Sequence, residues 1–173
     1  MTSGVLLFCL LLVAALSLLL GHLLRQRSGL PDGTVIYEDR GGKQTRVLVS
    51  HRYGLRGKPD YLLNDGAGWV IPVELKSSRI PRSGRPHRSH ALQLAAYFLL
   101  VEDALQQRVA YGLVRYKDGV LRIENSAHLR AELLAVMEEM RAALSSEDAS
   151  RSHRQAVRCR ACSVAYACDE RLA

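Results

Sequence analysis

Residues 57–76 read GKPDYLLNDGAGWVIPVELK, and this stretch decides the fold. Two apolar runs, Tyr61–Leu63 and Trp69–Glu74, flank a turn rich in Asn, Asp and Gly. Runs of this length separated by turn residues are typical of neighbouring strands. Pro72 predicts that the second strand is an edge strand or contains a bulge, because proline lacks a backbone N–H. The stretch therefore predicts part of a β-sheet.

The same stretch carries two carboxylates and a lysine. Glu74 and Lys76 are two residues apart, so on a strand they project from the same face. The preceding turn can bring Asp60 beside them. Two close carboxylates repel unless a cation lies between them, and Mg²⁺ or Mn²⁺ suits carboxylates and water. Such a metal activates water and neutralises phosphate charge, while Lys76 steadies the attacking water or that charge. A simple Glu74–Lys76 salt bridge is the alternative.

Regular elements are predicted on both sides of this stretch. Before it, residues 45–50 have the alternation of a strand. After it, residues 89–106 form an almost wholly apolar helix that should be buried. Residues 109–116 and 120–123 are predicted to pair as a hairpin around Lys117-Asp118-Gly119, and residues 127–144 carry an apolar stripe at helical spacing. Strands, helix, hairpin and helix in this order predict a mixed α/β domain with helices packed on the sheet.

Polar side chains interrupt the apolar helix on one face. Gln93 and Tyr97 are four residues apart, and His90 lies three residues before Gln93. Polar groups in a buried helix need partners, which could be a metal-bound water, a DNA phosphate or nearby backbone. This helix therefore supplies further candidate site residues.

The combination D-x13-E-x-K followed by Q-x-x-x-Y resembles the RecB-like branch of the PD-(D/E)XK nucleases. It is most similar to the CRISPR-associated exonuclease known as the fourth Cas protein. The resemblance implies a restriction-endonuclease-like core, with a mixed central sheet flanked by helices. It implies Asp60, Glu74 and the carbonyl of Leu75 as metal ligands and Lys76 as the catalytic lysine. Gln93 and Tyr97 would form a substrate-side motif.

A basic loop follows the candidate catalytic strand. It carries four arginines and no acidic residue until Glu102: Arg79, Arg82, Arg85 and Arg88. Arginines beside phosphate chemistry bind a nucleic-acid backbone without reading sequence. The alternative is a solvated loop without a ligand.

Three of the four cysteines cluster near the C-terminus as Cys159-x-x-Cys162-x5-Cys168. Such spacing indicates a metal or cluster site. It also resembles the last three cysteines of the CRISPR-associated branch, where a fourth cysteine completes a four-iron, four-sulfur cluster. Here the remaining cysteine, Cys9, lies in the apolar N-terminus. The candidates are therefore a zinc site completed by His153, an iron–sulfur cluster with another fourth ligand, or unligated thiols.

The N-terminal residues 5–24 are almost wholly apolar and carry no Asp, Glu, Lys or Arg. Twenty helical residues match the bilayer core, which predicts one transmembrane helix. Arg25 and Arg27 follow it and, by the positive-inside rule, predict a cytoplasmic nuclease domain on the cell membrane. The predicted organisation is an anchor with its flank (1–27), a linker (28–34) and the nuclease domain (35–173), with a cysteine-rich tail over 151–173.

The formal net charge of +7 lies wholly after residue 24 and favours a polyanionic partner. Together these features predict a membrane-anchored, Mg²⁺- or Mn²⁺-dependent exonuclease that acts on single-stranded DNA or DNA ends. Two alternatives remain: a non-catalytic nucleic-acid-binding module, and an adaptor whose basic loop touches anionic lipid.

Overall fold

The computed structural model describes residues 2–28, 33–38, 47–146 and 150–172. In the N-terminal helix it describes the side chains of residues 6–8 and 10–21. The chain divides into two compact units, Met1–Leu133 and Leu134–Ala173. The first unit contains the sheet and the second contains the three clustered cysteines.

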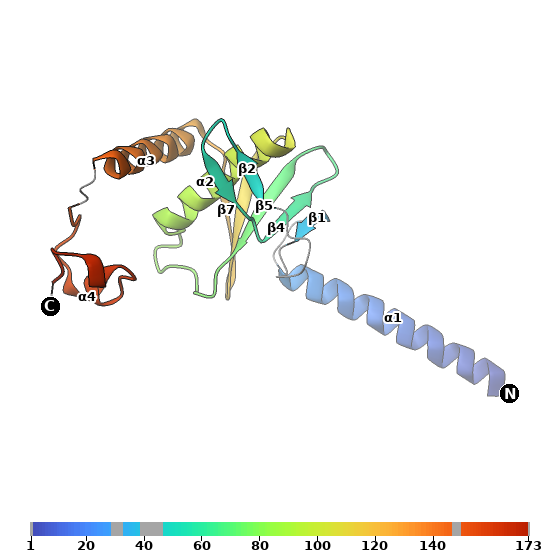
Figure 1. The fold of residues 1–173 in the computed structure, drawn as a ribbon. Coiled ribbons are helices and arrows are strands. Elements are labelled where there is room, and N and C mark those ends of the chain that lie inside the picture. The colour runs from blue at the N-terminus through green and yellow to red at the C-terminus, as the bar shows by residue number, and fades with distance from the viewer. Residues whose placement is uncertain (1, 29–32, 39–46, 147–149, 173) are drawn as a thin grey trace. The chain divides into compact units, whose positions relative to one another are not determined.

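Five strands form the main sheet in the order β1-β4-β5-β6-β7 (Figure 1). Their bounds are Thr34–Glu38, Tyr61–Asn64, Val70–Leu75, Tyr111–Tyr116 and Gly119–Glu124. β5 and β6 are parallel and the other pairs are antiparallel, so the sheet is mixed, as predicted. A separate two-stranded ladder pairs β2 (Leu48–Ser50) with β3 (Leu55–Gly57). The parallel pair requires a crossover, and α2 (Arg88–Leu105) provides it.

Pro72 lies in β5, which is the middle strand of this sheet, so the edge-strand prediction is wrong. Pairing towards β6 nevertheless shifts register beside the proline. From the Trp69–Arg108 bridge to the Val73–Leu113 pair, the chain advances four residues on one side and five on the other. This interruption allows a residue without an N–H to sit in a central strand.

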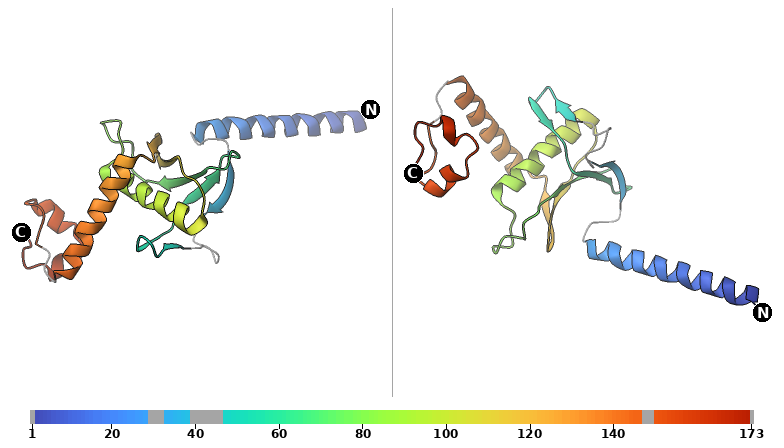
Figure 2. Two further views of the ribbon diagram at one scale, coloured as in Figure 1. Left: turned by 90° about the horizontal axis from the view of Figure 1, so that it is seen from above. Right: turned by 60° about the horizontal axis from the view of Figure 1, so that its bottom comes forward.

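The helix α2 covers one face of the sheet (Figures 1 and 2). The predicted burial is confirmed by seven buried residues: Leu94, Ala95, Tyr97, Phe98, Leu99, Leu100 and Val101. Gly112 of β6 permits this close packing, because a Cβ there would lie 2.8 Å from Phe98 Cε1 and 3.1 Å from Leu94 Cδ2. On the opposite face of the sheet, a second apolar cluster is formed by Leu63, Ile71, Val73 and Leu113.

The hairpin and the last long helix occur where the sequence places them. β6 and β7 are joined by the turn at Lys117-Asp118. The helix α3 runs from Ala127 to Ser145. Its predicted apolar stripe is buried at Leu129 and Leu133, whereas Met140 and Leu144 are exposed. The stripe is therefore only partly a core face.

Two strands were not predicted, and one is shorter than expected. β1 has five residues and β3 only three, and the first three residues of β1 are all exposed, so neither strand carries a clear period-two pattern. β2 begins at Leu48, and residues 45 and 46 of the predicted strand lie outside the described residues. The C-terminal unit adds a short helix α4 (Ala156–Arg160) and a 3₁₀ turn η1 (Ala165–Ala167).

The N-terminal helix α1 runs from Thr2 to Ser28. Within the described residues, no helix combines the length and apolarity needed to cross a membrane. The predicted span over residues 5–24 is therefore not confirmed.

Candidate active site

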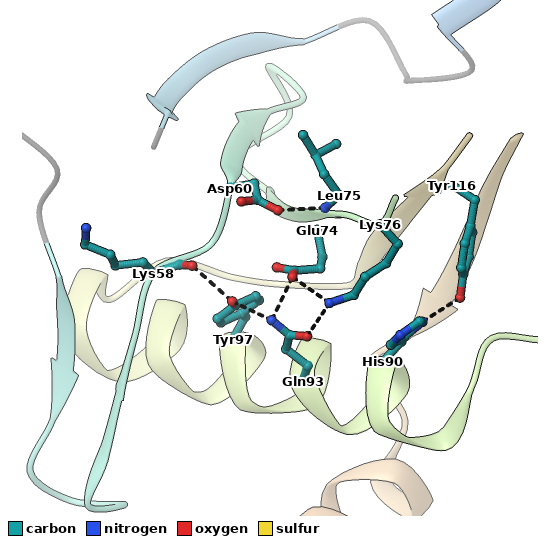
Figure 3. Close-up of polar contacts among 9 residues, drawn as sticks. All are labelled: Lys58, Asp60, Glu74, Leu75, Lys76, His90, Gln93, Tyr97 and Tyr116. Atoms are coloured by element: carbon teal, nitrogen blue, oxygen red, sulfur yellow. Dashed lines mark hydrogen bonds and ion pairs between the residues drawn. The ribbon is translucent and has the colours of Figure 1, made fainter. Parts of the chain in front are cut away.

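The register of β4 and β5 brings the two carboxylates together. Tyr61 pairs with Val73, so one further step along both strands places Asp60 opposite Glu74. The backbone N–H of Leu75 donates to Asp60 Oδ2 over 2.7 Å (Figure 3). Asp60 is therefore fixed to the strand that carries Glu74, although fourteen positions separate them in the sequence.

Lys76 points back towards Glu74, as the E-x-K spacing predicts. Its Nζ donates to Glu74 Oε1 and to Gln93 Oε1, both over 2.8 Å. Glu74 is buried, whereas the Lys76 side chain is 21% exposed. The salt bridge considered as an alternative is thus present, but it belongs to a larger network at the end of β5.

Both the oxygen and the nitrogen of the Gln93 side-chain amide form hydrogen bonds in this network. Its Nε2 donates to Glu74 Oε1 over 2.8 Å and to the Tyr97 hydroxyl over 2.9 Å, while its Oε1 accepts from Lys76. An amide satisfied on both sides has one orientation, so it holds the carboxylate and the ammonium in register. Gln93 thus joins Glu74, Lys76 and Tyr97 in one hydrogen-bonded network.

Tyr97 connects α2 to the GKPD loop. Its hydroxyl donates to the carbonyl oxygen of Lys58 over 3.0 Å. Gly57 allows this approach, because a Cβ there would lie 2.9 Å from Leu100 Cδ1 and 3.2 Å from Tyr97 Cε1. Burial raises the pKa of Tyr97, so its phenol stays protonated and serves as a donor. The loop that carries Asp60 is thus anchored to α2.

A model of the PD-(D/E)XK nuclease superfamily matches residues 15–169. The chain belongs to the PD-(D/E)XK nuclease superfamily. Its membership indicates nuclease activity on a nucleic-acid substrate with a divalent metal. Among solved structures, the crystal structure of SSO0001 is similar with 21% identity and a TM-score of 0.48, covering 94% of this chain and 71% of that one. The curated proteins contain no match.

The oxygen donors of this superfamily member fit a divalent cation. The hydrogen bonds described above use Asp60 Oδ2 and Glu74 Oε1, so the second oxygen of each carboxylate remains for a metal. Two carboxylates with a backbone carbonyl and water form the oxygen set that Mg²⁺ and Mn²⁺ prefer. No group of three or more His, Cys, Asp or Glu side chains arranged for a metal ion occurs in the described part of the chain, and this pair supplies only two.

The arginine loop connects β5 to α2, and two hydrogen bonds tie its beginning to the β6–β7 turn. Ile80 N–H donates to Asp118 Oδ1 over 2.8 Å, and Lys117 N–H donates to the carbonyl of Ser78 over 3.0 Å. Arg79, Arg82 and Arg85 are exposed. The fourth arginine of the prediction, Arg88, begins α2 and forms an ion pair with Glu132. Three arginines of the four are thus available to a ligand.

The predicted cysteine site gathers around one pocket in the C-terminal unit. Cys159, Cys162, Cys168 and His153 all line this pocket of about 220 Å³. Cys159 is buried, and the Nδ1 of His153 accepts a bond from the Gln155 N–H over 3.2 Å. The four side chains share a pocket, but within the described residues they are not arranged as a finished metal site.

Two contributors to the site were missed by the sequence reasoning. The carbonyl of Lys58 is a backbone group, and no side-chain pattern signals it. Tyr116, at the end of β6, contacts His90 with 2.8 Å between its hydroxyl and the ring Nδ1. Its position as the last residue of the predicted strand over 109–116 was the available signal.

Proposed function

We propose that this chain is a RecB-like deoxyribonuclease that hydrolyses DNA phosphodiester bonds with Mg²⁺ or Mn²⁺, acting as an exonuclease on single strands or DNA ends. The observation that carries the proposal is one hydrogen-bonded network. It joins Asp60, Glu74 and Lys76 to Gln93 and Tyr97. The RecB-like assignment rests on the order of these five residues.

Each residue of this network has a distinct role in the proposed phosphodiester hydrolysis. Asp60 and Glu74, with the Leu75 carbonyl, would hold the cation, which when bound lowers the pKa of water and neutralises phosphate charge. Lys76 places an ammonium where negative charge develops on the phosphate. Gln93 keeps that ammonium and the Glu74 carboxylate in fixed relation. Their orientation before substrate binds reduces the reorganisation required during the reaction.

The test uses the full-length chain with labelled linear single-stranded DNA, circular single-stranded DNA, duplex DNA and RNA. We expect Mn²⁺-dependent cleavage of linear single-stranded DNA that EDTA and Asp60→Ala both abolish. Resistance of the circular substrate supports an exonuclease, and its cleavage contradicts one. Intact DNA binding without cleavage favours a non-catalytic module. Binding to phosphatidylserine vesicles but not to DNA favours a membrane-surface adaptor.

The exposed arginines of the loop after β5 are proposed to bind the phosphates of the nucleic-acid backbone. Replacing Arg79, Arg82 and Arg85 together by alanine is expected to weaken DNA binding and to make it less salt-dependent. Each lost phosphate contact on a single strand lowers the slope of log K against log salt by about 0.7, so the slope should fall by about 2. Fluorescence anisotropy at several salt concentrations measures it.

A charge-matched control uses three exposed arginines of the C-terminal unit, Arg154, Arg158 and Arg160. Their replacement by alanine removes the same formal charge but leaves the loop beside β5 intact. An equal fall in slope for both triple variants would show general charge attraction and contradict a binding role specific to the loop.

The cysteine-lined pocket is proposed to hold a structural metal, either zinc or an iron–sulfur cluster. Three thiol groups and an imidazole are the donor set of a Cys₃His zinc site. We expect the purified full-length protein to contain one zinc ion per chain, or a cluster with visible absorbance, and Cys162→Ser to lose it. Asp60→Ala is the control and should retain it. A metal-free protein with full stability would contradict this proposal.

Residues 5–24 are proposed to anchor the protein in the cell membrane, with the nuclease domain in the cytoplasm. The support is the uncharged sequence, together with apolar α1 side chains that are more than half exposed, including Leu11, Leu16 and Leu18. Carbonate extraction of membranes containing the full-length chain tests the anchor. Release into the soluble fraction would contradict it.

A further inference from the structure

His90 lies on the same face of α2 as the network residues. It precedes Gln93 by three residues and Tyr97 by seven, which is the spacing of one helical stripe. Figure 3 shows all three side chains along the part of α2 that faces the end of β5. The catalytic network described above uses Gln93 and Tyr97 but leaves His90 without a role.

Tyr116 holds the His90 ring from the side of the sheet. The phenol is buried, and its hydroxyl lies 2.8 Å from His90 Nδ1. Burial raises the pKa of Tyr116, so its phenol keeps its proton. Donation of this proton to His90 Nδ1 satisfies the buried hydroxyl and leaves the ring proton on Nε2.

The Nε2 of His90 has no partner in the described part of the chain. No buried side-chain nitrogen or oxygen of these residues lacks a hydrogen bond, so this Nε2 must reach solvent. Burial lowers the pKa of His90, and the charges of Lys76 and His87 lower it further. The neutral ring therefore presents one N–H donor close to the catalytic lysine.

We propose that His90 binds a phosphate oxygen of the nucleic acid through its Nε2–H, beside Lys76, with Tyr116 as the residue that fixes its tautomer. This inference rests on the proposed function, because it assumes a nucleic-acid ligand at the Asp60–Glu74 site. Arg85 of the arginine loop lies five residues before His90 in the sequence, so a basic side chain precedes the proposed phosphate contact.

The test compares amide replacements that mimic either ring nitrogen. Glutamine at position 90 can place an amide N–H near the Nε2 position, whereas asparagine mimics Nδ1. Hydrogen bonds to charged groups contribute enough that His90→Ala should raise the Kd for single-stranded DNA about ten-fold. His90→Gln should recover most of this affinity and His90→Asn should not. Binding is measured by anisotropy of the full-length chain with Ca²⁺ and no Mn²⁺.

Two further variants separate binding from packing. Tyr116→Phe removes the hydroxyl and should raise the Kd by a smaller factor than His90→Ala. His128→Ala, an exposed histidine in the first turn of α3, is the matched control and should bind like the parent. Recovery by asparagine rather than glutamine would show that His90 only packs against Tyr116, and would overturn the proposal.

The readout also distinguishes failure of this inference from failure of the proposed function. If the parent binds DNA but does not cleave it with Mn²⁺, the nuclease proposal fails while the order of Kd values still tests His90. If the parent cleaves DNA and His90→Ala has the parental Kd and KM, the nuclease proposal stands and the His90 inference is overturned.

Discussion

Replacing Lys76 by methionine is expected to lower the DNA cleavage rate by about 10²- to 10³-fold, which is the usual effect of removing one oriented group that stabilises transition-state charge. Methionine keeps the unbranched apolar stem but removes the ammonium that bonds Glu74 and Gln93. Lys76→Arg should not restore the rate, because a planar guanidinium cannot reproduce a compact ammonium held by two acceptors. Single-turnover cleavage with saturating Mn²⁺ measures the effect.

The control for this prediction is Lys117→Met, which makes the same change at an exposed lysine in the β6–β7 turn. Its cleavage rate should match the parent. Because Lys76→Met leaves the buried Glu74 carboxylate without its ion pair, its unfolding midpoint is measured too, and the rates are compared at a temperature at which both proteins are folded. A Lys76→Met rate within ten-fold of the parent would show that the ammonium only balances the charge of Glu74.

The second large effect is expected in stability, at Gly112. A Cβ at this position would lie 2.8 Å from Phe98 Cε1 and 3.1 Å from both Leu94 Cδ2 and the Pro72 carbonyl oxygen. Both apolar side chains are fully buried, so neither has open space to enter. Overpacking typically costs about 1–3 kcal/mol, so Gly112→Ala should lower the free energy of unfolding by this amount and Gly112→Val by more.

Urea unfolding followed by the fluorescence of Trp69, the single tryptophan, measures this loss. Gly21→Ala is the control, because a Cβ at Gly21 meets nothing within 4 Å. It should not lower the unfolding midpoint, because alanine favours a helix more than glycine does. If Gly112→Val unfolds at the parental urea concentration, then α2 does not pack on β6 as closely as described.

The long elements could be predicted from the sequence because each has a clear physical signature. The predicted helix over 89–106 and the observed α2 differ by one residue at each end, since apolar residues fill most of its length. The β6–β7 turn followed from Asp118-Gly119. β1 and β3 could not be predicted, because their pairing with β4 and β2, and not a pattern in their own sequences, defines them as strands. The central position of β5 could not be predicted either. The sheet accommodates Pro72 through a register shift between β5 and β6, and such a shift depends on both strands.

Several predicted site residues lie together in the structure, but the contacts between them could not be predicted. The spacing of Glu74 and Lys76 required a shared face, and the structure places them in contact. The hydrogen bond from the Leu75 N–H to Asp60 could not be predicted, because it depends on the register of β4 and β5. The pairing of Arg88 with Glu132 depends on where α3 begins, so one predicted DNA-binding arginine has a protein partner.

The tie between Tyr97 and Lys58, with the bond between Leu75 and Asp60, has a consequence for the cell that produces this protein. Asp60 meets the Glu74–Lys76 pair only when the GKPD loop has assembled with β5 and α2. In a nascent or damaged chain these three side chains do not come together, so the chain cannot cut nucleic acid even where its local helices persist. The hazard of carrying a nuclease is thereby confined to molecules that have completed folding.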